Sequence, residues 1–194
     1  MSQAQRLELV FLLEGESDRA LLESLLPRFL ASNIIPKYIV FEGKTDLKRR
    51  MVTRIKTYIN PNAQFMVLCD KDANVCTELK QELIGLCRTS GKFQDCLVRI
   101  ACREIEAFYL ADLLAVEKGL NLRGLVKNQL TTKYRTPDKS DQPVFELVRL
   151  TEGKYTKVHG SRQIGKYLDL ENERSPSFKN LIRGIRKLES QLLA

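Results

Sequence analysis

The feature that most constrains this chain is a set of four short apolar runs that alternate with segments of helical periodicity. The runs have strand length and cover residues 8–13, 37–43, 64–69 and 96–102. Apolar residues then recur every three or four positions, as in residues 21–29 and 52–59, and helices are also expected near residues 73–87 and 107–119. This alternation predicts an α/β fold with a mainly parallel four-stranded sheet flanked by helices.

The length and the later part of the chain indicate how this fold is organised. The 194 residues are enough for one well-buried core, and no Pro/Gly/Ser-rich linker divides them. After about residue 119 the strand signals end, and short helical segments separated by polar turns follow. We therefore expect an α/β core over residues 7–119 and a helical C-terminal extension, or cap, over residues 120–194 that packs on the core.

Composition narrows the class of protein. The net charge of +8 fits attraction to phosphate polyanions or to an acidic protein partner. The five cysteines include no CxxC pair, and with a single histidine they make a zinc site improbable. No apolar run approaches the length of a membrane span. A cytoplasmic protein without membrane contact is expected, with most cysteines packed in the core.

Acidic side chains follow three of the four predicted strands. Parallel strands would bring these acids to one edge of the sheet, where open α/β folds bind their ligands. Crowded carboxylates repel one another and raise each other's pKa unless cations hold them. Hard divalent cations such as Mg²⁺, or Mn²⁺ in its place, suit such oxygen ligands. The candidate metal ligands are Glu14, Asp18, Asp70, Asp72, Glu104 and Glu106.

Each acidic pair also has a purely structural interpretation. Asp18 and Asp72 could cap the helices that follow, and Glu104 and Glu106 could be exposed acids in the first turn of a helix. A cap does not explain Glu14, which stands directly at the strand end before a glycine. An EF-hand is excluded between residues 70 and 81, because its glycine position holds valine and its final ligand position holds glutamine.

The acidic motifs resemble those of a known domain. A strand that ends in Glu-Gly-x-x-Asp, as in residues 14–18, and a later strand that ends in Asp-x-Asp, as in residues 70–72, are similar to the Toprim domain. That domain occurs in topoisomerases, bacterial primases and the overcoming-lysogenization-defect nucleases. The resemblance implies acid/base chemistry or metal binding for Glu14, and Mg²⁺ coordination for Asp70 and Asp72.

The downstream half resembles an uncharacterised Toprim-related family, a domain of unknown function. The similar segments are the Glu-x-Glu-Ala start of an aromatic-rich helix at residues 104–112, the KYTK block at 154–157, and residues 163–170 and 175–178. Members of that family often occur beside ATPases of the ABC or SMC type in phage-defence systems. The resemblance covers roughly residues 7 to 190 and implies nucleic acid and such an ATPase as partners.

These observations lead to a functional hypothesis with one alternative. Mg²⁺-dependent phosphodiester cleavage of nucleic acid is the leading function, with Glu14 in the chemistry and with Lys154 and Lys157 stabilising transition-state charge. The two lysines could instead be exposed loop residues. The alternative function is a non-catalytic Toprim-like module that binds nucleic acid or the ATPase partner and regulates it.

One helical segment is unusually basic and could follow a nucleic-acid backbone. It covers residues 44–56, between the second and third predicted strands. A solvated helix face is the other interpretation of such a run. The candidate nucleic-acid-binding residues are Lys44, Lys48, Arg49, Arg50 and Arg54.

Overall fold

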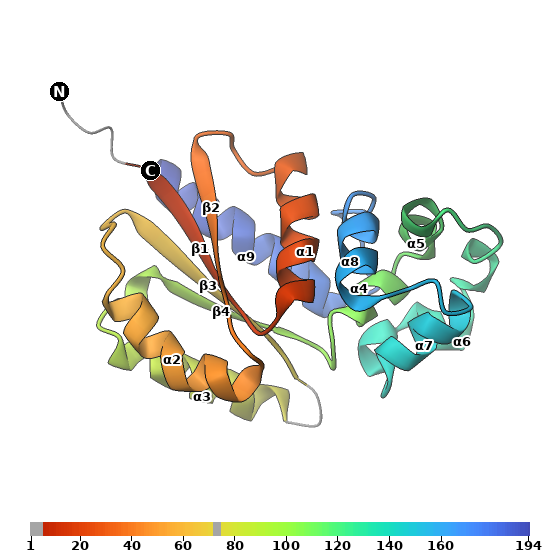
Figure 1. Cartoon of the computed structure of the whole chain (residues 1–194), viewed down its shortest axis with the longest axis horizontal. Coiled ribbons are helices and arrows are strands. Elements are labelled where there is room, and N and C mark those ends of the chain that lie inside the picture. Colours follow the sequence, from red (N-terminus) through yellow and green to blue (C-terminus); the bar gives the residue numbers. More distant parts are fainter. Residues whose placement is uncertain (1–5, 72–74) are drawn as a thin grey trace.

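A computed structural model describes residues 6–71 and 75–194 and contains a four-stranded, all-parallel sheet in the order β2-β1-β3-β4 (Figure 1). The strands are β1 (Leu7–Leu13), β2 (Ile34–Val40), β3 (Ala63–Asp70) and β4 (Cys96–Ala101). Leu13 pairs with Leu68, and Asp70 pairs with Ala101, so the strands end along one edge. The predicted parallel α/β fold is confirmed.

The second strand begins three residues earlier than the sequence suggested. The apolar run was expected from residue 37, but β2 starts at Ile34 and includes Pro36. Proline lacks a backbone N–H and is tolerated in β2 because this strand lies at the edge of the sheet. After β2, Gly43 adopts a φ of 88°, a left-handed conformation that favours glycine, and the next helix begins.

Helices cover both faces of the sheet. Helices α2 (Lys44–Lys56) and α3 (Cys76–Thr89) lie on one face, and α1 (Glu16–Leu25) and the C-terminal α9 (Pro176–Leu193) lie on the other (Figure 1). Side chains of β1 alternate between the two cores: Phe11 packs with α1 and α9, and Leu12 packs with α2 and α3. Both are fully buried, as a parallel sheet covered on two faces requires.

The remaining helices form a lobe beyond the carboxyl ends of the strands (Figure 1). The lobe contains α4 (Glu106–Leu110), α5 (Leu113–Leu120), α6 (Thr132–Arg135), α7 (Pro143–Leu150) and α8 (Lys157–Gly165). One helix was expected over residues 107–119, but it is broken because Asp112 caps α5 by accepting the Ala115 N–H at 3.0 Å. The boundary expected after residue 119 falls within α5. No described helix is long and apolar enough to cross a membrane.

Short 3₁₀ turns connect several of these elements. They are η1 (Leu26–Arg28), η2 (Phe93–Asp95), η3 (Val126–Asn128) and η4 (Pro137–Lys139). The turn η1 ends α1, and η2 leads into β4.

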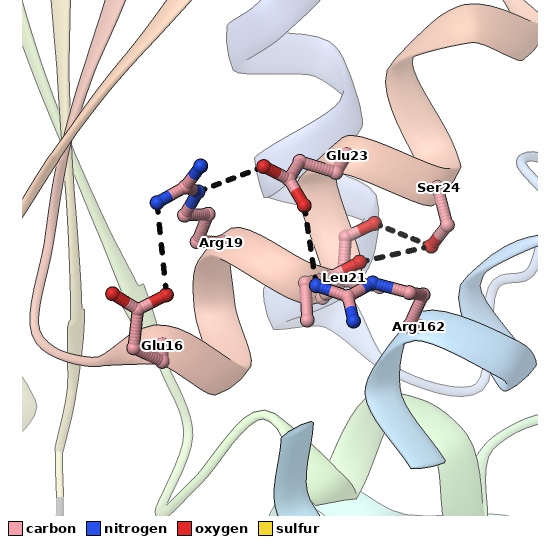
Figure 2. Close-up of polar contacts among 7 residues, drawn as sticks. Glu16, Arg19, Leu21, Glu23, Ser24 and Arg162 are labelled. Atoms are coloured by element: carbon pink, nitrogen blue, oxygen red, sulfur yellow. Dashed lines mark hydrogen bonds and ion pairs between the residues drawn. The ribbon is translucent and has the colours of Figure 1, made fainter. Parts of the chain in front are cut away.

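Helix α8 docks closely on α1, which brings the lobe to the sheet edge. A Cβ on Gly165 would lie 2.2 Å from Ser24 Oγ and 3.1 Å from the Leu21 carbonyl oxygen of α1. Ser24 donates its hydroxyl to that same Leu21 oxygen at 2.8 Å, and Arg162 of α8 lies 3.4 Å from Glu23 of α1 (Figure 2). This contact fixes the first residue of α8, Lys157, in relation to the strand ends.

Candidate functional site

The ends of β1 and β3 are joined through the carboxylate of Glu14. Its Oε2 accepts the backbone N–H of Asp70 at 3.1 Å and the thiol of Cys69 at 3.2 Å. Burial raises the pKa of Cys69, and Glu14 raises it further, so this thiol stays protonated and donates. Glu14 therefore bridges two neighbouring strands, a role that no helix cap explains.

Asp18 caps α1 and is also buried among other acids. Its Oδ2 accepts the N–H of Gly15 at 3.0 Å, which satisfies the helix start. The side chain is nevertheless buried, and burial raises the pKa of Asp18 to about 7 against the effect of that hydrogen bond. Glu14 and Glu106 raise this pKa further by repulsion. Asp18 therefore has both roles: it caps α1, and it lies in a cluster of acids with Glu14 and Glu106.

Glu106 is buried inside the lobe at the start of α4. Only 1% of the residue is exposed, and its Oε1 accepts the Tyr155 hydroxyl at 2.8 Å. Burial raises the pKa of Glu106, and the hydrogen bond from Tyr155 opposes that rise. The alternative interpretation, an exposed acid of a first helical turn, is wrong for Glu106.

Tyr155 is held in place by tight packing. A Cβ on Gly160 would come within 2.3 Å of the Tyr155 ring, so the first turns of α8 leave room for the tyrosine only because this residue is glycine. The Tyr155 ring also packs against the Tyr109 ring, with centroids 6.0 Å apart. The hydroxyl therefore points at Glu106 with little freedom.

Lys157 lies beside these acids. Its Nζ lies 3.5 Å from Glu104 Oε1, and the Glu104 side chain remains 25% exposed. Burial lowers the pKa of Lys157, but Glu106, Glu104 and Asp70 together raise it above its ordinary value. Lys154 lies in an exposed turn, and no ion pair among the described residues includes it.

The basic residues of α2 have different surroundings. Lys48 pairs with Glu82 at 2.7 Å, and Arg49 and Arg50 both pair with Asp46, at 2.7 and 3.2 Å. Lys44 lowers the pKa of Cys69 and so lies near the acidic cluster. Arg54 lines a cavity of about 1020 Å³ at the amino ends of β1 and β3. The five predicted nucleic-acid contacts are therefore spread over both ends of α2.

The acids offer the ligand atoms that a hard divalent cation prefers, but the described side chains are not arranged around one point. Their carboxylate oxygens are the ligands that Mg²⁺ takes, and one or two of them with water suffice. Among residues 6–71 and 75–194, however, no group of three His, Cys, Asp or Glu side chains is arranged to hold a metal ion. Asp72, the second acid of the predicted Asp-x-Asp pair, lies outside the described residues.

Two contributors to the site were not predicted from the sequence. Tyr155 donates a hydrogen bond to Glu106, which is 49 positions away in the sequence, and Cys69 of β3 donates one to Glu14 at the end of β1. The tyrosine stands inside the KYTK block that was noted only for its lysines. The cysteine lies within an apolar strand, where core packing is the ordinary expectation.

Comparisons with known proteins agree with this architecture. The C-terminal region of the Burkholderia pseudomallei OLD protein superposes with a TM-score of 0.51 at 15% identity, over 93% of this chain and 98% of that chain. This likeness supports the fold. No curated protein gives a significant match. The model of a family described as domain of unknown function (DUF4276) matches residues 13–186, so the chain belongs to that family.

Proposed function

We propose that this protein is a metal-dependent phosphodiesterase that cleaves nucleic acid. The observation that carries the proposal is the convergence of buried and half-buried carboxylates with Lys157 at the carboxyl edge of a parallel sheet. The resemblance to the overcoming-lysogenization-defect (OLD) nucleases and the fold shared with part of an OLD protein support the same conclusion.

The chain's own residues divide the work in this proposal. Mg²⁺ or Mn²⁺, when bound, would supply an activated water and charge stabilisation on the leaving oxygen. Glu14 and Asp70 would hold the ion from adjacent strand ends, with Asp72 beside them in the sequence. Lys157, whose raised pKa keeps it charged, would face a phosphate oxygen.

The remaining acids would shape the rear and the rim of the site. Glu106 is fixed by Tyr155 and Asp18 by the start of α1, so neither side chain has to reorganise when substrate binds. Glu104 lies at the rim, partly exposed and beside Lys157. Lys154 stays a candidate that would reach substrate only from the exposed turn.

The biological setting is proposed from the resemblance and, for the cytoplasm, from the cysteine usage. The protein would act in the cytoplasm as the effector of a phage-defence system, with an ABC- or SMC-type ATPase as its partner. The net charge of +8 is consistent with either nucleic acid or an acidic partner surface.

A second candidate function is a non-catalytic module that binds nucleic acid or the ATPase and regulates it. The observation that favours it is that Cys69 and the backbone of Asp70 already donate hydrogen bonds to Glu14. Under this alternative the carboxylates hold the strand ends together and turn over no substrate.

Cleavage assays separate the two candidates. Purified protein, with and without its candidate ATPase, is incubated with labelled DNA and RNA in Mg²⁺, Mn²⁺ or EDTA. We expect metal-dependent cleavage that Glu14→Gln abolishes and that Glu16→Gln preserves, because the Glu16 side chain is 60% exposed on α1. Intact substrate under all conditions, or full activity in Glu14→Gln, would refute the catalytic proposal.

A further inference from the structure

We infer that the cavity between α7 and the end of β4 binds one unpaired nucleobase of the strand that is cleaved. This inference rests on the proposed function and names its substrate class: single-stranded DNA or RNA. The cavity has a volume of about 590 Å³, within the range typical of small-ligand sites. Glu104 lines it, and Glu104 is the acid beside Lys157 at the rim of the proposed site.

The apolar wall of the cavity presents an exposed aromatic ring. Val144, Phe145 and Val148 of α7 line this wall, and Phe145 is 59% exposed. A phenylalanine left so accessible is available for stacking, and every nucleobase offers a flat face to such a ring. The site therefore suits a base that has been released from a double helix.

The charges in the cavity favour a base over a phosphate. Arg103 forms an ion pair with Asp141, and both line the cavity together with Glu104. Lys157 lies 3.5 Å from Glu104, so each carboxylate has a cationic partner and the cavity has no excess positive charge to attract a phosphate. The carboxylate oxygens still offer acceptors for the amino groups of a neutral base. The phosphate would then remain outside, toward Lys157.

The backbone at the cavity mouth is held in an unusual conformation. Arg103 has a φ of 67°, the left-handed region that a residue with a side chain seldom adopts. This turn directs the chain from the end of β4 to Glu104 and α4. Such strain is often retained where it positions functional groups, and here it places Arg103 and Glu104 in the wall of one cavity.

A second cavity extends the path along the lobe. It measures about 460 Å³, shares Asp141 and Gln142 with the first, and is also lined by Lys139 and by the ion pair of Lys133 with Glu146. Lys139 suits the backbone of the neighbouring nucleotides. The strand would thus run from the acidic cluster, past Phe145, toward η4.

The test measures binding without cleavage. Fluorescence anisotropy in EDTA is recorded for a labelled 15-mer as single-stranded DNA, as single-stranded RNA and as duplex DNA. We expect Phe145→Ala to weaken binding of the single strands about 5- to 150-fold and Phe145→Trp to preserve it. Leu130→Ala is the matched control, because Leu130 is 76% exposed on the same lobe and lines neither cavity.

A spectroscopic readout identifies stacking itself. The fluorescence of an oligonucleotide that contains 2-aminopurine should fall on binding to the wild type and to Leu130→Ala, and should not fall with Phe145→Ala. Thermal unfolding of each variant shows whether the fold is intact. Equal affinity of Phe145→Ala and wild type for single strands would overturn the base site, as would equal loss of single-strand and duplex binding.

The outcomes also separate this inference from the proposed function. Phe145-dependent binding without cleavage in any metal would refute the nuclease and keep the base site. Metal-dependent cleavage with an unchanged KM in Phe145→Ala would refute the base site and keep the nuclease. Failure of every oligonucleotide to bind would overturn the base site, and the cleavage assay in Mg²⁺ or Mn²⁺ would decide separately on the nuclease.

Discussion

Replacing Tyr155 by phenylalanine tests whether its hydrogen bond ties the segment before α8 to α4 within the lobe. The tyrosine hydroxyl donates to Glu106 Oε1 at 2.8 Å, and both residues are buried. A hydrogen bond to a charged group contributes about 1.5–3 kcal/mol, and the phenylalanine ring would keep the packing against Tyr109. We therefore expect Tyr155→Phe to lower the free energy of unfolding by about 2 kcal/mol.

Urea-induced unfolding at pH 7 in EDTA gives this number without any contribution from bound metal. Tyr167→Phe is the control, because Tyr167 is 46% exposed and its loss should change stability by less than about 0.5 kcal/mol. In a double-mutant cycle with Glu106→Leu, the two changes should be non-additive. Equal stability of Tyr155→Phe and Tyr167→Phe would refute the hydrogen bond as the link.

Three further predictions concern packing, pH and metal. Gly165→Ala should lower the free energy of unfolding by about 1–3 kcal/mol, because its Cβ would meet α1. Gly85→Ala in α3 is the control and should raise it by about 0.5–1 kcal/mol, because no atom lies within 4 Å of the added Cβ. Equal effects in urea titrations would contradict the close docking of α8. Burial raises the pKa of Asp46, but two arginines and a backbone N–H lower it more, so its folded pKa lies below 3.8. The ionised Asp46 therefore stabilises the fold fully above its unfolded pKa of 3.8, and this stabilisation is lost as the pH falls through the folded pKa. The Tm difference between wild type and Asp46→Asn should be clear at pH 7 and shrink at pH 3. Mg²⁺ or Mn²⁺ should raise the Tm of the wild type more than that of Asp70→Asn in thermal-shift assays, and an unchanged Tm for both would count against a metal site.

The predictable part of the fold depended on local patterns. Apolar runs of strand length and helical periodicity can be seen within short stretches of sequence. They predicted the parallel sheet and the position of Glu14 and Asp70 at the same edge of it. The break at Asp112 has a local signal too, an N-cap residue, but the apolar pattern on both sides hid it.

The unpredicted part depended on contacts between distant residues. Tyr155 and Glu106 are 49 positions apart, and no periodicity links them. Their contact exists because Gly160 and Gly165 let α8 approach Tyr155 and α1 closely. In the sequence a glycine predicts only a weak point in a helix. It does not identify the neighbour that packs into the space left by the missing side chain.

The burial of the acids is the strongest physical reason to treat the strand edge as a functional site. A helix cap needs one carboxylate near a backbone N–H, and the exposed side of a helix start provides that without desolvation. Here the lobe covers Asp18 and Glu106, and their pKa values rise because the charged forms lose water and repel one another. The hydrogen bonds from Gly15 and Tyr155 do not fully offset this desolvation cost, because the pKa values of Asp18 and Glu106 remain raised. The position of these acids at the carboxyl edge of a parallel sheet, with Lys157 beside Glu104, is the observation on which the proposed phosphodiester chemistry rests.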